Sequence, residues 1–194
     1  MDHSTSRAAV RGLTYIVATA ALGFAACGPA EREVRVQPAP GESYILDDAE
    51  IRSITMAANN SEIQEGRLAL QKSRNDAVRQ FAQRMITDHT ALNQRIAADM
   101  NRAHRPAARG PLPHQLMTNS QRTMQTLQQL EGMQFDRTYI QNQVAVHQWL
   151  LNTLDNALIP SAHDNRLEDD LKDARETVAA HLQHARQIQS SLAR

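Results

Sequence analysis

Apolar residues recur at intervals of three and four positions along most of this chain, and this spacing constrains its fold more than any other feature. An α-helix turns once in about 3.6 residues, so residues spaced in this way share one face of a helix. Aromatic residues make up only 4% of the chain, which leaves little material for a β-sheet. The sequence therefore predicts an all-α protein in which each helix buries one apolar stripe.

Four long stretches carry this spacing, and residues that commonly end helices separate them. The stretches run from a capping Asp47 or Asp48 to a break at Ser73 and Asn75, from about Asp76 to the Arg105 and Pro106 region, from about 135 to 159 before Pro160, and from about Asn165 onward. Each stretch is long enough to cross a whole domain. We therefore expect four long helices.

The connections between these helices differ in length. The links between helices one and two and between helices three and four are short, so each pair is expected to form an antiparallel hairpin. Residues 106–113 are expected to form a loop, and 116–130 a shorter helix that stops at Gly132. The expected architecture is an antiparallel four-helix bundle of the ferritin-like kind, with this extra short helix between helices two and three.

Residues 1–26 have the layout of a lipoprotein signal peptide. A basic start with Arg7 and Arg11 precedes an apolar run over 12–26, and small residues come immediately before Cys27. The apolar run is too short for a comfortable membrane span. The sequence therefore predicts export from the cytoplasm.

Cys27 is the single cysteine, and residues 23–28 resemble a bacterial lipobox, with Phe24 where that pattern prefers leucine. In that pattern a peptidase cuts before the cysteine, which becomes the lipidated first residue. The alternatives are an ordinary secretion signal or a free buried thiol. Gly28, rather than aspartate, follows the cysteine and points by resemblance to the outer membrane. We expect a lipid-anchored protein on the periplasmic face of the cell envelope.

The rest of the chain divides into a tether and one domain. Residues 27–43 are rich in proline and charge and lack an apolar period, so they are expected to be flexible, and 44–194 to form the bundle. Lys+Arg and Asp+Glu balance at 21 each, so no field would steer the domain onto nucleic acid. No phosphate-binding loop, dinucleotide fingerprint, nucleophile elbow or zinc-protease motif occurs, which disfavours the common hydrolases and nucleotide enzymes.

Each long helix places one polar residue of a metal-ligating type on its otherwise apolar stripe. These residues are Glu62, His89, His147 and His181. Glu62 lies about as far before the first turn as His89 lies after it, so the two are expected at nearly the same level. His147 and His181 are similarly placed about the second turn, with an expected offset of about one helical turn. We therefore expect a polar cluster at mid-bundle.

Imidazole and carboxylate groups are ligands for zinc, iron, manganese and copper. Further ligands or hydrogen-bond partners of such a site would be Glu65, Asp88, Asp136 and His184. Di-iron bundles usually carry Glu-x-x-His motifs, which do not occur here, so the sequence favours a mononuclear or structural site. The alternative is that Glu62 and His89 satisfy each other by hydrogen bonding and bind nothing. The remaining histidines, His3, His104, His114 and His163, are expected to be solvated.

Several strings of the chain resemble a known bacterial family. They are SEIQEGRLA at 61–69, VRQFAQRMITDH at 78–89, FDRTYI at 135–140, QVAVH at 143–147 and the pair His181 and Leu182. The chain resembles the family of domain of unknown function 4142 over about 47–193. The resemblance implies a ferritin-like fold, export, frequently an outer membrane location, and no established activity. It covers Glu62, Asp88, His89, Asp136, Tyr139, His147 and His181, and so adds Tyr139 to the neighbours of the candidate site.

Three functions remain open at this point. The leading hypothesis is a non-enzymatic envelope protein that binds a ligand, with a transition metal in its core, under stress conditions. The second is a metal-dependent redox enzyme of ferritin-like type, with Glu62, His89, His147 and His181 as ligands. The third is a structural module that docks envelope proteins through the helix at 116–130. Oligomeric state is not predicted.

Overall fold

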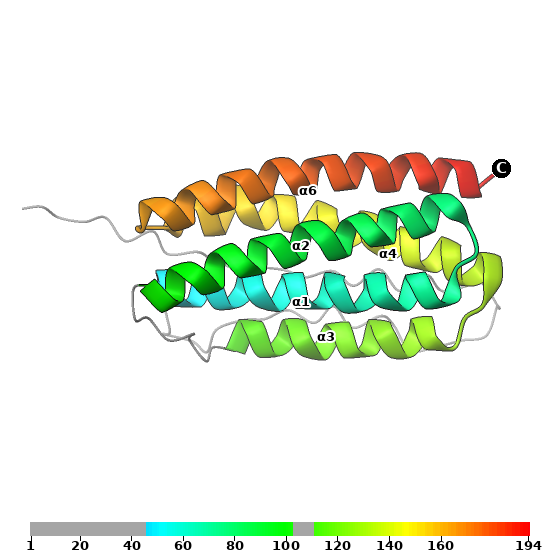
Figure 1. Cartoon of the computed structure of the whole chain (residues 1–194), viewed down its shortest axis with the longest axis horizontal. Helices are drawn as coiled ribbons and strands as arrows, with labels where there is room; N and C mark the ends of the chain where they lie inside the picture. Colours follow the sequence, from blue (N-terminus) through cyan, green and yellow to red (C-terminus); the bar gives the residue numbers. More distant parts are fainter. Residues whose placement is uncertain (1–45, 103–110) are drawn as a thin grey trace, which may run out of the picture.

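The computed structural model describes residues 46–102 and 111–194, and its regular structure there is helical (Figure 1). The elements are α1 (Asp48–Lys72), α2 (Asp76–Arg102), α3 (Pro111–Gln128), α4 (Gly132–Thr153), the π-helical turn η1 (Leu154–Leu158), α5 (Ile159–Ser161) and α6 (Asn165–Leu192). The all-α expectation is confirmed. None of the helices in these two ranges combines the length and apolar character needed to cross a membrane. The predicted signal peptide, Cys27, the tether, His3 and His104 lie outside the described residues.

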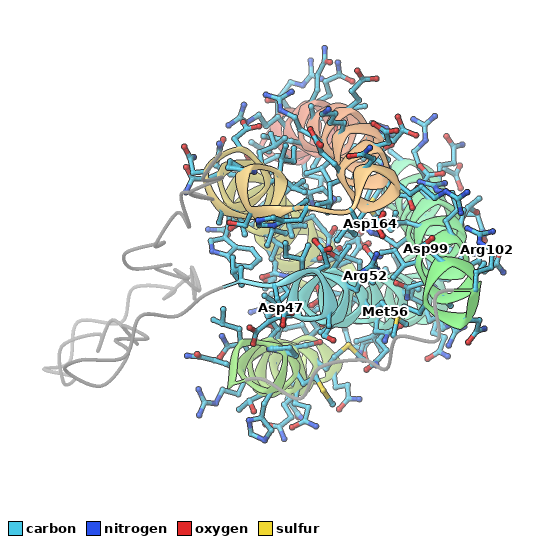
Figure 2. All side chains as sticks on the ribbon, turned by 90° about the vertical axis from the view of Figure 1, so that its left-hand side faces the viewer. Asp47, Arg52, Met56, Asp99, Arg102 and Asp164 are labelled. Carbon is cyan, nitrogen blue, oxygen red and sulfur yellow. The ribbon has the colours of Figure 1, made fainter. Side chains whose placement is uncertain are left out.

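The long helices pack as two antiparallel hairpins. α1 pairs with α2 and α4 pairs with α6, and α2 lies beside α6 and joins the hairpins (Figure 1). α3 packs against α1, on the outside of the other helices when the molecule is viewed end-on (Figure 2). This agrees with the expected pairing of helices one with two and three with four.

Side chains at the predicted starts of α1, α2 and α6 cap the first turns of these helices. The backbone N–H of Glu50 donates to Asp47 Oδ1 at 2.8 Å, at the first turn of α1. Asn75 Oδ1 accepts from the first turn of α2, and Asp164 Oδ1 accepts from the first turn of α6. Such bonds satisfy N–H groups that have no partner inside the helix. The break at Ser73 and Asn75 is confirmed.

Two boundaries differ from the prediction. α3 begins at Pro111, so 111–113, expected as part of a loop, are helical. Proline is tolerated in the first turn of a helix, where its missing N–H has no partner to lose. Gly132, expected to stop the preceding helix, instead begins α4 and has a φ of +53°, a left-handed conformation that glycine adopts without strain.

The helix that contains α4 does not end at Thr153 but continues through η1 and α5 to Ser161. Pro160 lies in its last turn. Proline cannot donate to the carbonyl of the preceding turn, and the wider π turn comes directly before it. The predicted end at Pro160 is therefore correct to within one residue, with a local widening that the sequence pattern did not show.

A buried ion-pair network joins three helices at one end of the bundle (Figure 2). Arg52 of α1 is only 1% exposed, and its Nη2 lies 3.0 Å from Asp99 Oδ2 of α2 and 3.1 Å from Asp164 Oδ2 at the start of α6. Arg102 and Arg166 lie at the outer side of Asp99. Long polar side chains therefore bridge the helices here.

α1 and α2 approach closely at Gly66. A Cβ atom at this position would lie 3.0 Å from the backbone oxygen of Ala82 and 3.0 Å from Cγ1 of Ile86. Backbone atoms cannot move aside as a flexible side-chain tip can. Glycine at this position therefore permits the short distance between the two helices.

Two large apolar clusters lie in the interior, one toward each end of the bundle, and a smaller third cluster contains Leu92, Ile96 and Ala174. The first surrounds Phe81 and Tyr139, near the turn between α1 and α2. The second surrounds Ile51 and Leu171, near the turn between α5 and α6. On α4 and α6 a histidine stands between the residues that enter the two large clusters, and on α2 His89 stands between the first cluster and the third. The bundle therefore carries a polar layer between two apolar ones.

Candidate metal centre

Three of the four predicted ligand residues meet in this polar layer. His89 of α2, His147 of α4 and His181 of α6 each place one ring nitrogen within 4.8 Å of the others. Their ring centroids are 5.4 to 6.0 Å apart. The residues are 4%, 0% and 1% exposed, respectively. The offset expected between His147 and His181 is not seen, and we refer to these three residues as the histidine cluster.

Two histidines of the cluster use one ring nitrogen each as a donor. His181 Nε2 lies 2.9 Å from Asp88 Oδ2, and His147 Nδ1 lies 2.9 Å from the backbone oxygen of Gln143. A carbonyl or carboxylate oxygen can only accept, so these nitrogens carry the protons. Nδ1 of His181 and Nε2 of His147 therefore hold lone pairs.

An amide chain on the surface side fixes the third ring. His89 Nδ1 lies 2.9 Å from Asn59 Oδ1. The Nδ2 group of Asn59 donates to Asn93 Oδ1, and Nδ2 of Asn93 donates to Asn60 Oδ1. Because Asn59 uses its Nδ2 group to donate to Asn93, the atom that faces His89 is Oδ1, which can only accept. His89 Nδ1 therefore carries the proton and Nε2 the lone pair.

The three remaining nitrogens, His89 Nε2, His147 Nε2 and His181 Nδ1, are buried without a hydrogen-bond partner among residues 46–102 and 111–194. Buried nitrogens in native proteins nearly always have one, so three together require an explanation. Histidines that bind metals almost always donate their other ring N–H to an oxygen, which orients the ring. The cluster has this arrangement in all three rings.

Burial keeps these histidines neutral. It lowers the pKa of His147 to about 3, with a further contribution from His181. Burial, and then His147 and His181, lower the pKa of His89 well below its ordinary 6.5. Burial also lowers the pKa of His181, although its bond to Asp88 opposes the shift. The lone pairs are therefore available at neutral pH without loss of a proton.

Phe81 lies beside the cluster on the side of the first apolar cluster. Its ring makes edge contacts with His147 at 6.3 Å and His181 at 6.4 Å between centroids. His184, predicted as a further ligand, contacts Phe81 at 5.4 Å, but its nitrogens are not part of the histidine cluster. Phe81 therefore separates the cluster from the apolar layer.

Glu62, the fourth predicted ligand, lies in a second polar group with Glu65. Asn142 Nδ2 donates to Glu65 Oε2 at 2.8 Å, and Gln143 Nε2 donates to the same oxygen at 3.2 Å. Gln143 also hydrogen-bonds to Glu62, whose Oε2 is buried without a partner. Burial raises the pKa of Glu62 to about 7, and burial together with the charge of Glu62 raises the pKa of Glu65 well above its ordinary value. Gln143 links this pair to the histidine cluster.

The other predicted neighbours have separate surroundings. Of them, only Asp88 bonds to a histidine of the cluster. Tyr139 is stacked on Phe135, and burial raises the pKa of its hydroxyl well above the ordinary value. Asp136 is buried, and its Oδ1 has no partner within the described residues. His114 and His163 are exposed, as expected.

Sequence reasoning missed Asn59 and Gln143 as the groups that orient His89 and His147. Gln143 lies one turn before His147 on the same stripe, and Asn59 lies one turn before Glu62. The polar side chain of Asn59, one turn from Glu62, was the available signal for the first, whereas the second bond uses the backbone carbonyl of Gln143 and has no signal in the sequence.

Replacing Glu62 with glutamine is expected to change how stability depends on pH. The native carboxyl keeps its proton between its ordinary pKa of 4.5 and about 7, whereas the unfolded one releases it. The stability that this group contributes is therefore full below pH 4.5 and is lost as pH rises through about 7. Relative to the parent protein, Glu62→Gln should gain about 3 kcal/mol in free energy of unfolding between about pH 4 and pH 8.

Urea unfolding of the metal-free proteins between about pH 4 and pH 8 would measure the difference in free energy of unfolding between variant and parent. The histidines titrate in both proteins, so their contribution largely cancels in this difference. Glu176→Gln, at an exposed position of α6, is the matched control and should give a flat difference. A flat difference for Glu62→Gln as well would contradict the raised pKa.

Comparison with known proteins supports the fold and assigns the family. The crystal structure of a Streptomyces coelicolor protein of the DUF305 family, described as secreted, superposes with a TM-score of 0.64 at 10% identity, over 75% of this chain and 95% of that one. No protein with a curated description matches the chain. The model of the family described as Domain of unknown function (DUF4142) matches residues 34–188. The resemblance seen in the sequence is thus confirmed, and the chain belongs to the DUF4142 family.

Proposed function

We propose that this protein is an exported binding protein that holds one zinc or copper ion at His89, His147 and His181. The observation that carries the proposal is that three buried histidines from three helices bring ring nitrogens within 4.8 Å of one another, and that each ring keeps one nitrogen without a partner among the described residues. Each ring is held by a hydrogen bond through its other nitrogen. A cluster that served packing alone would leave three acceptors unsatisfied at a cost of roughly 1 to 3 kcal/mol each.

The geometry suits an ion with short bonds to nitrogen. Three atoms no more than 4.8 Å apart lie within about 2.8 Å of a common centre, and zinc–nitrogen bonds are about 2.0 to 2.1 Å long. Each nitrogen would move inward by less than about 1 Å. Neutral imidazoles favour zinc, copper, iron and nickel, whereas magnesium, calcium and manganese prefer oxygen ligands. Copper binds most strongly within this series, and zinc is commonly held by three protein ligands with a fourth position open.

Export and lipid anchoring are part of the proposal. The signal-like residues 1–26 and the lipobox-like Cys27 support them, and the structural neighbour is described as secreted. We further propose that the two hairpins form a bundle of the ferritin-like kind, tethered by 27–43 to the periplasmic face of the outer membrane.

Metal loading of the purified protein tests the function. Protein prepared without a histidine tag or chelator is stripped, offered zinc, copper, iron or manganese, passed through a desalting column and analysed for metal. We expect about one zinc or copper ion per chain, and cobalt(II) in the same site should give the visible bands of a four-coordinate complex. Protein that leaves the column without metal in every case would overturn the proposal.

A further inference from the structure

A cavity of about 120 Å³ lies next to the histidine cluster, between α1, α2, α6 and the segment of α4 and η1. Its walls are mostly apolar, and include Ile54, Leu92, Trp149, Leu154 and Val178. His89 and Asn59 also line it. For comparison, an apolar cavity of about 150 Å³ holds one benzene molecule in another protein. The cavity therefore has the size of a small organic molecule.

The charged groups at the cavity are already paired. Asp88 accepts from His181, and Arg95 Nε lies 2.8 Å from Asp170 Oδ1 of α6. A charged ligand would have to compete with these partners, and it would also lose its hydration on entering apolar surroundings. The cavity therefore suits a neutral molecule.

Two residues of the wall carry a polar atom that has no partner within the described residues: His89, whose Nε2 belongs to the histidine cluster, and Thr153. Thr153 is 3% exposed, lines the cavity, and its Oγ1 is buried without a hydrogen bond. Helical threonines commonly bond the carbonyl one turn earlier. In the described helices, five others do so: Thr55, Thr87, Thr118, Thr126 and Thr177. Thr153 also comes directly before the π turn, a feature frequent at functional sites.

We propose that this cavity binds a small neutral aromatic molecule that carries one hydroxyl group, of the size and type of phenol. The ring would fill the space between Leu92, Leu154 and Val178, and the hydroxyl would hydrogen-bond to Thr153 Oγ1. This site goes beyond the proposed metal binding and does not require it, because Thr153 and the apolar walls are present without an ion.

Fluorescence of Trp149 measures occupancy directly, since it is the only tryptophan in the chain and lines the cavity. Phenol or toluene is titrated into the metal-free protein with excitation at the red edge of the tryptophan band. We expect saturable changes with both. Thr153→Val keeps the shape and removes the hydroxyl, so it should weaken phenol binding about fivefold, the worth of one hydrogen bond, and leave toluene binding unchanged.

Thr126→Val is the control for this substitution, because Thr126 bonds its own helix and does not line the cavity. Ala174→Phe should fill the cavity and abolish both titrations, whereas Ala180→Phe, at an exposed position of the same helix, should not. If Ala174→Phe does not fold, the comparison of phenol with toluene binding in Thr153→Val still tests whether the cavity binds phenol through Thr153.

A linear, non-saturating response to phenol in the parent protein would overturn the proposal. So would a Thr153→Val variant that binds phenol as tightly as the parent, or that weakens phenol and toluene equally. Repeating the titration with zinc separates the two sites. If the protein binds phenol but retains no metal in the loading experiment, the cavity site is supported and the metal proposal fails separately.

Discussion

Replacement of His147 with leucine is expected to weaken zinc or copper binding at least 100-fold, while the metal-free protein keeps its stability or gains some. His147 donates only to the carbonyl of Gln143 in its own helix, so no bond between helices is lost. Leucine has a similar volume and removes a buried nitrogen that has no partner. A ligand of a three-residue site cannot be lost without a large effect on affinity.

Competition with a coloured chelator would give the affinity, and urea unfolding of the metal-free proteins would give the stability. His114→Leu is the matched control, because His114 is exposed on α3 and belongs to no cluster. A His147→Leu variant with unchanged metal affinity, or with a clear loss of metal-free stability, would indicate a structural histidine instead.

Replacement of Asp99 with alanine is expected to lower the free energy of unfolding by roughly 3 to 5 kcal/mol. It removes one of the two carboxylates that pair with the buried guanidinium of Arg52, whose Nε and Nη1 have no partner (Figure 2). The remaining Asp164 is partly exposed and also caps α6. A buried charge with too few partners is costly because neither water nor protein replaces its lost hydration.

Asp170→Ala is the control for this prediction, since Asp170 also joins α2 to α6, but its partner Arg95 has a side chain that is 48% exposed, whereas that of Arg52 is 1% exposed. Pairs of this kind contribute about 1 kcal/mol or less. Urea unfolding of both variants measures the contrast. Equal losses would show that the burial of Arg52 carries no special cost.

Much of the fold follows from the sequence pattern, because helical spacing and capping are local properties. Asp47, Asn75 and the stretch before Pro160 placed helix ends to within a few residues. The start of α3 was missed because Pro111 and Pro113 look like loop residues unless the first turn of a helix is known to begin there. The π turn was missed because it depends on packing around it.

The candidate site was only partly predictable for a related reason. Apolar stripes show which face of a helix is buried, so they correctly predicted that His89, His147 and His181 lie in the interior. They do not fix the relative height of two helices to better than about one turn. Glu62 was therefore expected opposite His89, whereas the structure places Asn59 there and Glu62 beside Gln143.

The close approach of α1 and α2 at Gly66 couples the distance between these two helices to the position of His89. α2 is a stiff rod that touches α1 at Ala82, and His89 follows two turns later, about 10 Å along the helix. A side chain inserted at Gly66 would tilt that rod, and a tilt of about 5° would displace His89 by about 1 Å, well beyond the tolerance of about 0.2 Å in metal–ligand distances. The residue at position 66 would thus affect the geometry of the histidine cluster from seven residues away along α2, at Ala82.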